Sequence, residues 1–92
     1  MEQKEIEKVI SEYFSIDIKD IYSKSQKKDV VLARHLLIFI LHDKENVSYS
    51  KLSVKFKVCT RNIQYIVYKM RSYVQYDKEI KKYFTHISNM LL

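Results

Sequence analysis

The sequence predicts an all-α, compact six-helix domain that contains a helix-turn-helix. Neither glycine nor proline occurs in its 92 residues. These two residues mark most hairpins and tight turns, so their absence favours helices joined by short polar links. Apolar residues also recur with helical spacing along nearly the whole chain. The length suits one modest hydrophobic core, and we therefore expect residues 1–92 to form a single domain.

Composition also excludes several classes of protein. A chain without glycine has no Gly-rich loop to hold a nucleotide. The longest apolar run, residues 36–41, is far shorter than the roughly 20 residues of a membrane-spanning helix. The acidic N-terminus resembles no signal peptide, so we expect a cytoplasmic protein without membrane contact. Cys59 is the only cysteine, which rules out an internal disulfide and a CxxC zinc site.

The first third of the chain alternates helical and polar stretches. Residues 3–14 repeat apolar side chains at i, i+3, i+4 and i+7, which predicts a helix with one buried face. Asp17 is suited to cap a short second helix that ends near Tyr22. Residues 23–28 are polar and basic without an apolar period, and we expect them to form a loop.

The middle of the chain predicts the core element. From Val30 to about His42 apolar residues are dense on nearly every side, as in a helix covered by its neighbours. Asp29 is placed to open this helix. Residues 43–46 are charged and polar, and we expect a link there.

The remaining apolar residues predict three more helices. Ser48 stands where an N-cap is expected, ahead of a short helix over residues 48–56. A turn at 57–59 leads to a helix over about 60–74, whose apolar residues are spaced by four, three and four. A closing helix is expected over about 78–90.

The positive charge is concentrated in one segment. Residues 51–71 contain six basic residues and no acidic one, whereas the rest of the chain has eleven of each. This segment lies in the predicted helix-turn-helix, residues 47–74, so it predicts binding to double-stranded DNA with the second helix in the major groove. The alternative is an ordinary solvated face rich in lysine.

The second helix of this motif offers groups that can read bases. Its apolar face should be buried, which leaves the other residues outward. Arg61 suits the edge of guanine, Asn62 or Gln64 suits adenine, and Tyr65 suits the methyl group of thymine. Lys69 suits a phosphate. The alternative is again a solvated face, with Tyr65 and Tyr68 packed partly against their neighbours.

Several stretches occur in an order and spacing that match a known domain. Residues 9–16 are similar to its opening helix, 20–25 to the approach to its basic loop, and 30–34 to the start of its long central helix. Residues 46–48 and 52–56 are similar to the first part of its helix-turn-helix. Over nearly its whole length the chain resembles the C-terminal DNA-binding domain of the DnaA family of bacterial chromosomal replication initiators. The resemblance implies a monomeric domain that binds origin DNA.

Departures from the family pattern fall on the base-reading residues. The family signature Asp-His-Thr-Thr corresponds to residues 59–62, and a preceding Gly-Gly-Arg corresponds to 57–58, one residue shorter. Gln26 matches the family's minor-groove arginine, and Arg34 matches an arginine near the phosphate backbone. The resemblance therefore implies another target sequence, or little sequence preference, and no ATPase module in these residues. The complete set of expected DNA-binding residues is Lys24, Gln26, Lys27, Lys28, Arg34, Ser48, Lys57, Thr60, Arg61, Asn62, Gln64, Tyr65 and Lys69.

Enzymatic and metal-binding functions find little support in the sequence. His35, His42 and His86 are scattered, and no known catalytic motif is present. We expect no enzyme, no cofactor and no metal site. Cys59, at a helix N-terminus beside basic residues, is suited to a lowered pKa and a thiol switch on DNA binding. A small, half-buried side chain is the alternative for Cys59.

A protein-interaction module is the stronger competing hypothesis. The chain has eight tyrosines, and tyrosine is enriched at protein interfaces as well as on DNA-facing surfaces. The tyrosine-rich surface consists of Tyr65, Tyr68, Tyr73 and Tyr76. No sustained heptad is present, so we expect a monomer or a weak dimer.

Overall fold

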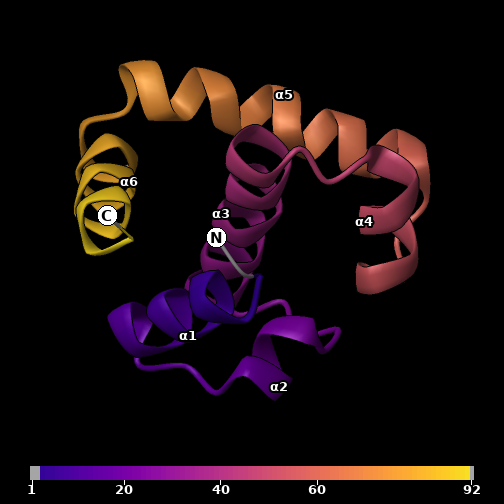
Figure 1. Ribbon diagram of the computed structural model, residues 1–92, viewed down its shortest axis with the longest axis horizontal. Coiled ribbons are helices and arrows are strands. Elements are labelled where there is room, and N and C mark those ends of the chain that lie inside the picture. Colours follow the sequence, from indigo (N-terminus) through magenta and orange to yellow (C-terminus); the bar gives the residue numbers. More distant parts are fainter. Residues whose placement is uncertain (1–2, 92) are drawn as a thin grey trace.

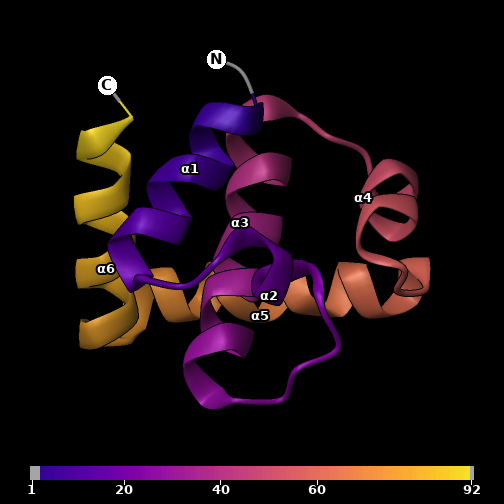
Figure 2. The ribbon, with the colours of Figure 1, turned by 90° about the horizontal axis from the view of Figure 1, so that it is seen from below.

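The computed structural model describes residues 3–91, which form six α-helices and no strand (Figure 1). The central helix α3 stands between α5 on one side and α1 with α2 on the other, while α4 and α6 lie at opposite ends of α5 (Figures 1 and 2). The predicted all-α fold is confirmed. The bounds are α1 Gln3–Phe14, α2 Ile18–Tyr22, α3 Lys28–Glu45, α4 Tyr49–Phe56, α5 Thr60–Tyr76 and α6 Lys78–Met90.

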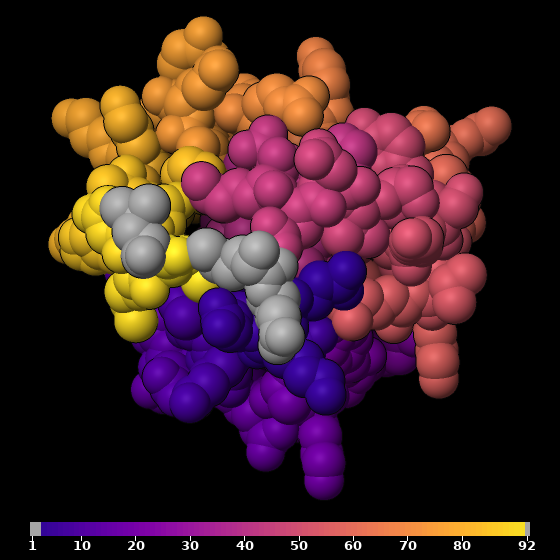
Figure 3. All heavy atoms as spheres, in the orientation of Figure 1, coloured from indigo at the N-terminus to yellow at the C-terminus, as the bar shows by residue number. Residues whose placement is uncertain are grey.

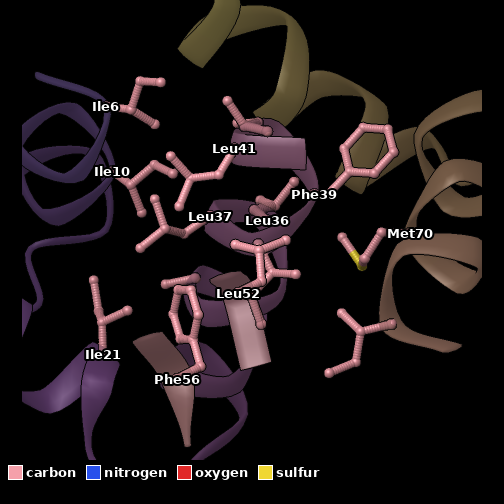
Figure 4. Close-up of a cluster of buried hydrophobic side chains, with 14 of the residues drawn as sticks. Ile6, Ile10, Ile21, Leu36, Leu37, Phe39, Leu41, Leu52, Phe56 and Met70 are labelled. Atoms are coloured by element: carbon pink, nitrogen blue, oxygen red, sulfur yellow. The ribbon is translucent and has the colours of Figure 1, made fainter. Parts of the chain in front are cut away.

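The core is built around α3, as the dense apolar pattern predicted. Residues 36–41 of this helix are all buried, because the other helices cover it on several sides. Figure 4 shows how side chains from the other helices meet it, with Ile10 of α1, Ile21 of α2, Leu52 of α4 and Met70 of α5 around the same centre. Truncating a fully buried leucine such as Leu37 to alanine is expected to cost about 2–5 kcal/mol.

Two helices, α2 and α4, begin where the sequence predicted N-caps. The backbone N–H of Lys19 donates to Oδ1 of Asp17 at 2.9 Å, and that of Lys51 donates to Oγ of Ser48 at 3.1 Å. Asp77 caps α6 in the same way. Each cap satisfies an N–H group that the first turn of a helix leaves without a partner.

The expected link over residues 43–46 is wrong, because α3 continues through Glu45. The chain has no glycine or proline to break the helix there, and Asp43 and Lys44 are exposed on its surface. Nζ of Lys44 lies 5.5 Å from the ring centroid of Phe84 on α6. The helix also begins two residues before Val30, at Lys28, after an N-cap at Lys27. Similarly, α5 extends past the expected residue 74 to Tyr76.

Three helices end with a left-handed residue that is not glycine. The φ angles are 55° at Ser15, 54° at Asn46 and 56° at Lys57. Glycine commonly fills such positions because a Cβ atom is unfavourable there. A chain without glycine has to support these three turns in other ways.

Side-chain hydrogen bonds stabilise all three turns with the same spacing. Oγ of Ser53 donates to the carbonyl oxygen of Val58 at 2.5 Å, five residues later. Ser11 makes the equivalent bond at the end of α1, and Nδ1 of His42 makes it at the end of α3 at 3.0 Å. These bonds hold the chain direction after each helix, including the turn that leads into α5.

No helix among the described residues is both long and apolar enough to cross a membrane.

Candidate nucleic-acid interface

The helix-turn-helix consists of α4, a turn at residues 57–59 and α5. Both helices bury one face against the core, and the buried residues are Leu52, Phe56, Ile63, Ile66, Val67 and Met70. The predicted turn and the predicted core face of α5 are confirmed. With this face buried, the orientation of α5 about its own axis is fixed, and so is the set of residues that it presents to solvent.

The predicted base-reading residues lie on the outward face of α5. Side chains of this helix project along the upper edge of the molecule in Figure 3. Tyr65 is 63% exposed. Lys69 is half-buried, and its Nζ lies 5.4 Å from the centroid of the Tyr65 ring. The exposed members of the predicted set on α5 are Thr60, Arg61, Asn62, Gln64 and Tyr65.

The basic loop, residues 23–27, joins α2 to α3 and lies beside the helix-turn-helix. Nζ of Lys24 donates to the carbonyl oxygen of Lys57 at 2.9 Å, which ties the loop to the turn before α5. Nε2 of Gln26 donates to the carbonyl oxygen of Lys24 at 3.4 Å. Lys24, Gln26, Lys27 and Lys57 are exposed. Lys28, expected in the loop, is exposed in the first turn of α3.

Arg34 lies elsewhere than the resemblance implied. Instead of facing solvent near a phosphate backbone, it is 9% exposed. Its Nε donates to the carbonyl oxygen of Ile21 at 2.7 Å, and its Nη2 donates to those of Ser23 and Ser25 at 2.7 and 3.0 Å. Burial lowers the pKa of the guanidinium from its ordinary value. Arg34 therefore positions the basic loop.

Two adjoining hollows of about 250 and 320 Å³ separate the basic loop from α5. Gln26, Val31 and His35 line both of them, and Lys69 lines the larger one. Burial lowers the pKa of His35 to about 4, with further lowering by the charges of Lys69 and Arg34. His35 is therefore neutral near pH 7, and the positive charges around the hollows come from lysine and arginine.

A family model described as the bacterial dnaA protein helix-turn-helix matches residues 3–61, more than half of the chain. The chain belongs to this DnaA family. The chain is also similar to the chromosomal replication initiator protein DnaA of onion yellows phytoplasma (strain OY-M), with 25% identity over 79 residues. These residues are 86% of this chain and 16% of that protein, so the chain spans about a sixth of the length of this relative.

The DnaA match includes α1 to α4 and ends at Arg61, the second residue of α5. The scaffold and the turn therefore follow the family pattern, while most of α5 lies beyond the matched residues. A DnaA helix-turn-helix domain is a non-catalytic DNA-binding domain. Within residues 3–91, no cluster of three or more His, Cys, Asp or Glu side chains is placed to hold a metal ion.

Two further residues singled out from the sequence lie at the starts of the two helices of this DnaA motif. The hydroxyl of Ser48 accepts the capping hydrogen bond of α4, and the side chain stays exposed. Cys59 is the N-cap residue of α5 and makes no capping bond through its side chain. It is a free, exposed thiol, so the half-buried alternative is wrong. The thiol switch stays a hypothesis.

Sequence reasoning missed the contacts that connect the basic loop to the turn before α5. The Lys24–Lys57 bond joins residues 33 positions apart, and no periodic pattern predicts it. The buried position of Arg34 had a weaker signal: it lies in the middle of the most apolar helix, where an unpaired charge is costly and needs nearby acceptors.

Proposed function

We propose that this DnaA-type domain binds double-stranded DNA with the first half of α5 in the major groove and the basic loop on the neighbouring backbone. The observation that carries this proposal is the Lys24–Lys57 hydrogen bond. It holds the loop beside the turn that leads into α5, so both segments can meet one duplex. Residues 46–76 contain no acidic side chain that would repel phosphate.

Base recognition would come from the first two turns of α5. The guanidinium of Arg61 can donate two hydrogen bonds to guanine, while the amide of Asn62 or Gln64 can pair with adenine. Tyr65 can contact the methyl group of thymine. The N-terminus of α5, at Thr60, also favours a nearby phosphate through its free N–H groups. These groups differ from the family signature, so we expect another sequence preference than that of the DnaA box.

Backbone contacts would come from lysines of the basic loop, the turn before α5 and α5 itself. Lys24, Lys27 and Lys28 follow the loop, Lys57 lies at the turn, and Lys69 lies on α5. Each can neutralise one phosphate and release counterions. Arg34 takes no direct part in this mechanism and instead fixes the loop through three carbonyl groups.

Fluorescence anisotropy with a DnaA-box duplex and a scrambled duplex tests the proposal between roughly 50 and 200 mM salt. About five phosphate contacts predict an affinity loss on the order of 10²- to 10³-fold over this range. Failure to bind either duplex at low salt would contradict the proposal and would favour the protein-interaction module with its tyrosine-rich surface.

Two variants then separate the backbone contacts from the base contacts. Lys28→Ala should weaken all duplexes by a similar factor and reduce the salt slope by about one. Arg61→Ala should instead relax the preference at one base pair, a change of about 1–3 kcal/mol. Lys8→Ala, which removes an exposed charge from α1 on the other side of α3, is the matched control. Equal and uniform effects of the Lys28 and Arg61 variants would contradict the division between the two segments.

A further inference from the structure

Three exposed tyrosines form a line along α5, which we call the tyrosine stripe: Tyr65, Tyr68 and Tyr76. Their side chains are 63%, 74% and 81% exposed, unusually high for large aromatic residues. At 3.6 residues per turn these three positions fall within an arc of about 80° around the helix axis. They span 11 residues, or about 16 Å along the helix.

Packing within the domain does not account for the stripe. Within residues 3–91, no ring or hydrogen-bonding partner contacts the side chains of Tyr68 and Tyr76. Duplex recognition does not account for all of it either. A recognition helix reads bases mainly with its N-terminal residues, whereas Tyr76 is the last residue of α5, about 24 Å from Thr60.

Cationic side chains accompany the rings, and α5 contains no acidic residue. Lys69 places its ammonium 5.4 Å from the centroid of the Tyr65 ring. Arg61 and Arg71 are exposed on the same helix. A second copy of the chain is a poor occupant, because two surfaces of a protein with net charge +6 would repel each other.

A partner that fits this surface carries regular negative charge and flat apolar faces. Single-stranded nucleic acid has both, since its phosphates can contact the cations while its unpaired bases stack on the rings. Bases that are paired within a duplex do not offer their faces in this way. At a base spacing of about 3.4 Å, the stripe has room for roughly five nucleotides.

We propose that the tyrosine stripe is a binding site for single-stranded DNA, with bases stacked on Tyr68 and Tyr76 and phosphates held by Lys69 and Arg71. This function is separate from duplex binding by the first half of α5. The two sites share Arg61, Tyr65 and Lys69, so duplex and single strand would compete for that part of the helix.

The test compares two single strands of equal length and charge. One is oligo-dT of 15 nucleotides, and the other is an abasic oligonucleotide with the same number of phosphates. Oligo-dT should bind at least tenfold more tightly and should quench tyrosine fluorescence, which is measurable because the chain has no tryptophan. Equal affinity for the two strands would overturn the proposal, since charge alone would then explain the binding.

Substitutions locate the site and distinguish stacking from other contacts. Tyr68→Ala and Tyr76→Ala should each weaken oligo-dT binding about tenfold, while Tyr68→Phe and Tyr76→Phe keep the ring and should keep the affinity. Val54→Ala, at a residue that is 79% exposed on α4, is the matched control. Circular dichroism confirms folding of each variant. A loss with phenylalanine as large as that with alanine would contradict stacking.

Measuring the duplex affinity of the same variants separates the two functions. Tyr76→Ala should leave duplex affinity unchanged while it weakens the single strand. If the protein binds the duplex but shows no preference for oligo-dT over the abasic strand, only the single-strand site is refuted. If it prefers oligo-dT but does not bind the duplex, only the proposed duplex function is refuted. Loss of self-association in Tyr68→Ala or Tyr76→Ala, seen by sedimentation in the absence of DNA, would instead assign the stripe to a second copy.

Discussion

Lys24 and Lys57 are 33 residues apart in the sequence, yet the ammonium nitrogen of Lys24 lies 2.9 Å from the carbonyl oxygen of Lys57. Lys57 is the left-handed residue that ends α4. Its carbonyl is exposed, so a side chain from the basic loop can reach it. The bond links the loop to the turn before α5, and this matters because both are expected to meet the same DNA.

Lys24→Met removes this bond along with one charge, whereas Lys27→Met removes a charge and leaves the bond intact. We expect Lys24→Met to lower duplex affinity about five- to tenfold more than Lys27→Met, since the loop would then have to be ordered on binding. Anisotropy at fixed salt measures the difference. Hydrogen exchange of the loop amides should also be faster in Lys24→Met. Equal affinities of the two variants would show that Lys24 acts only as a charge.

Arg34→Lys tests whether this arginine positions the loop or contacts phosphate. Lysine keeps the charge but cannot donate to the carbonyl oxygens of Ile21, Ser23 and Ser25 together, as the guanidinium does. We expect the free energy of unfolding in urea to fall by about 2–4 kcal/mol. Unchanged stability with reduced DNA affinity would return Arg34 to the backbone-contact role that the resemblance implied.

Lys57→Gly should stabilise the domain by about 0.5–1 kcal/mol, because glycine adopts the left-handed conformation without the Cβ penalty. The backbone carbonyl that accepts from Lys24 is retained. Lys57→Ala still carries a Cβ atom and should show no such gain, which makes it the control. Thermal or urea unfolding measures both variants. A gain of equal size in the two would point to removal of the lysine charge as the cause.

His35 makes stability depend on pH below neutrality. Its pKa is lowered to about 4 in the folded chain from an ordinary value of 6.5. The unfolded chain therefore binds a proton between these values that the folded chain does not. The free energy of unfolding is therefore unaffected by His35 above about pH 6.5 and decreases as the pH falls toward 4. The loss should be about 1–2 kcal/mol, allowing for a partly exposed group.

His35→Gln should remove this part of the pH dependence. Urea unfolding at about pH 7 and pH 4.5 gives the comparison, and His86→Gln serves as a control because His86 is exposed. An identical loss of stability with acid in wild type and His35→Gln would show that other groups cause it.

Local sequence patterns predicted the helices well, and the reasons are physical. The caps at Asp17 and Ser48 follow from side-chain chemistry close in sequence. The end of α3 was placed too early because a charged stretch resembles a link. In the structure that stretch is helical and solvated, and the end is set by the left-handed Asn46.

The outward face of α5 could be predicted because helical periodicity fixes it once Ile63, Val67 and Met70 are buried. The arrangement around the basic loop could not. The roles of Lys24 and Arg34 depend on carbonyl groups that the fold brings close to these side chains. Neither the charge pattern nor the helical periodicity of the sequence indicates which carbonyl groups these are. Their identification required the positions of the loop and of α3.

The most direct test of duplex binding by α5 and the basic loop is an NMR map of amide shifts during titration with a short DNA duplex. An 11.2 kDa domain suits this measurement. The largest changes should fall on residues 23–28, 57–58 and 60–69, while the amides of α1 and α6 should change little. Changes centred on α6 or on the last turn of α5, or no changes at low salt, would contradict the proposed interface.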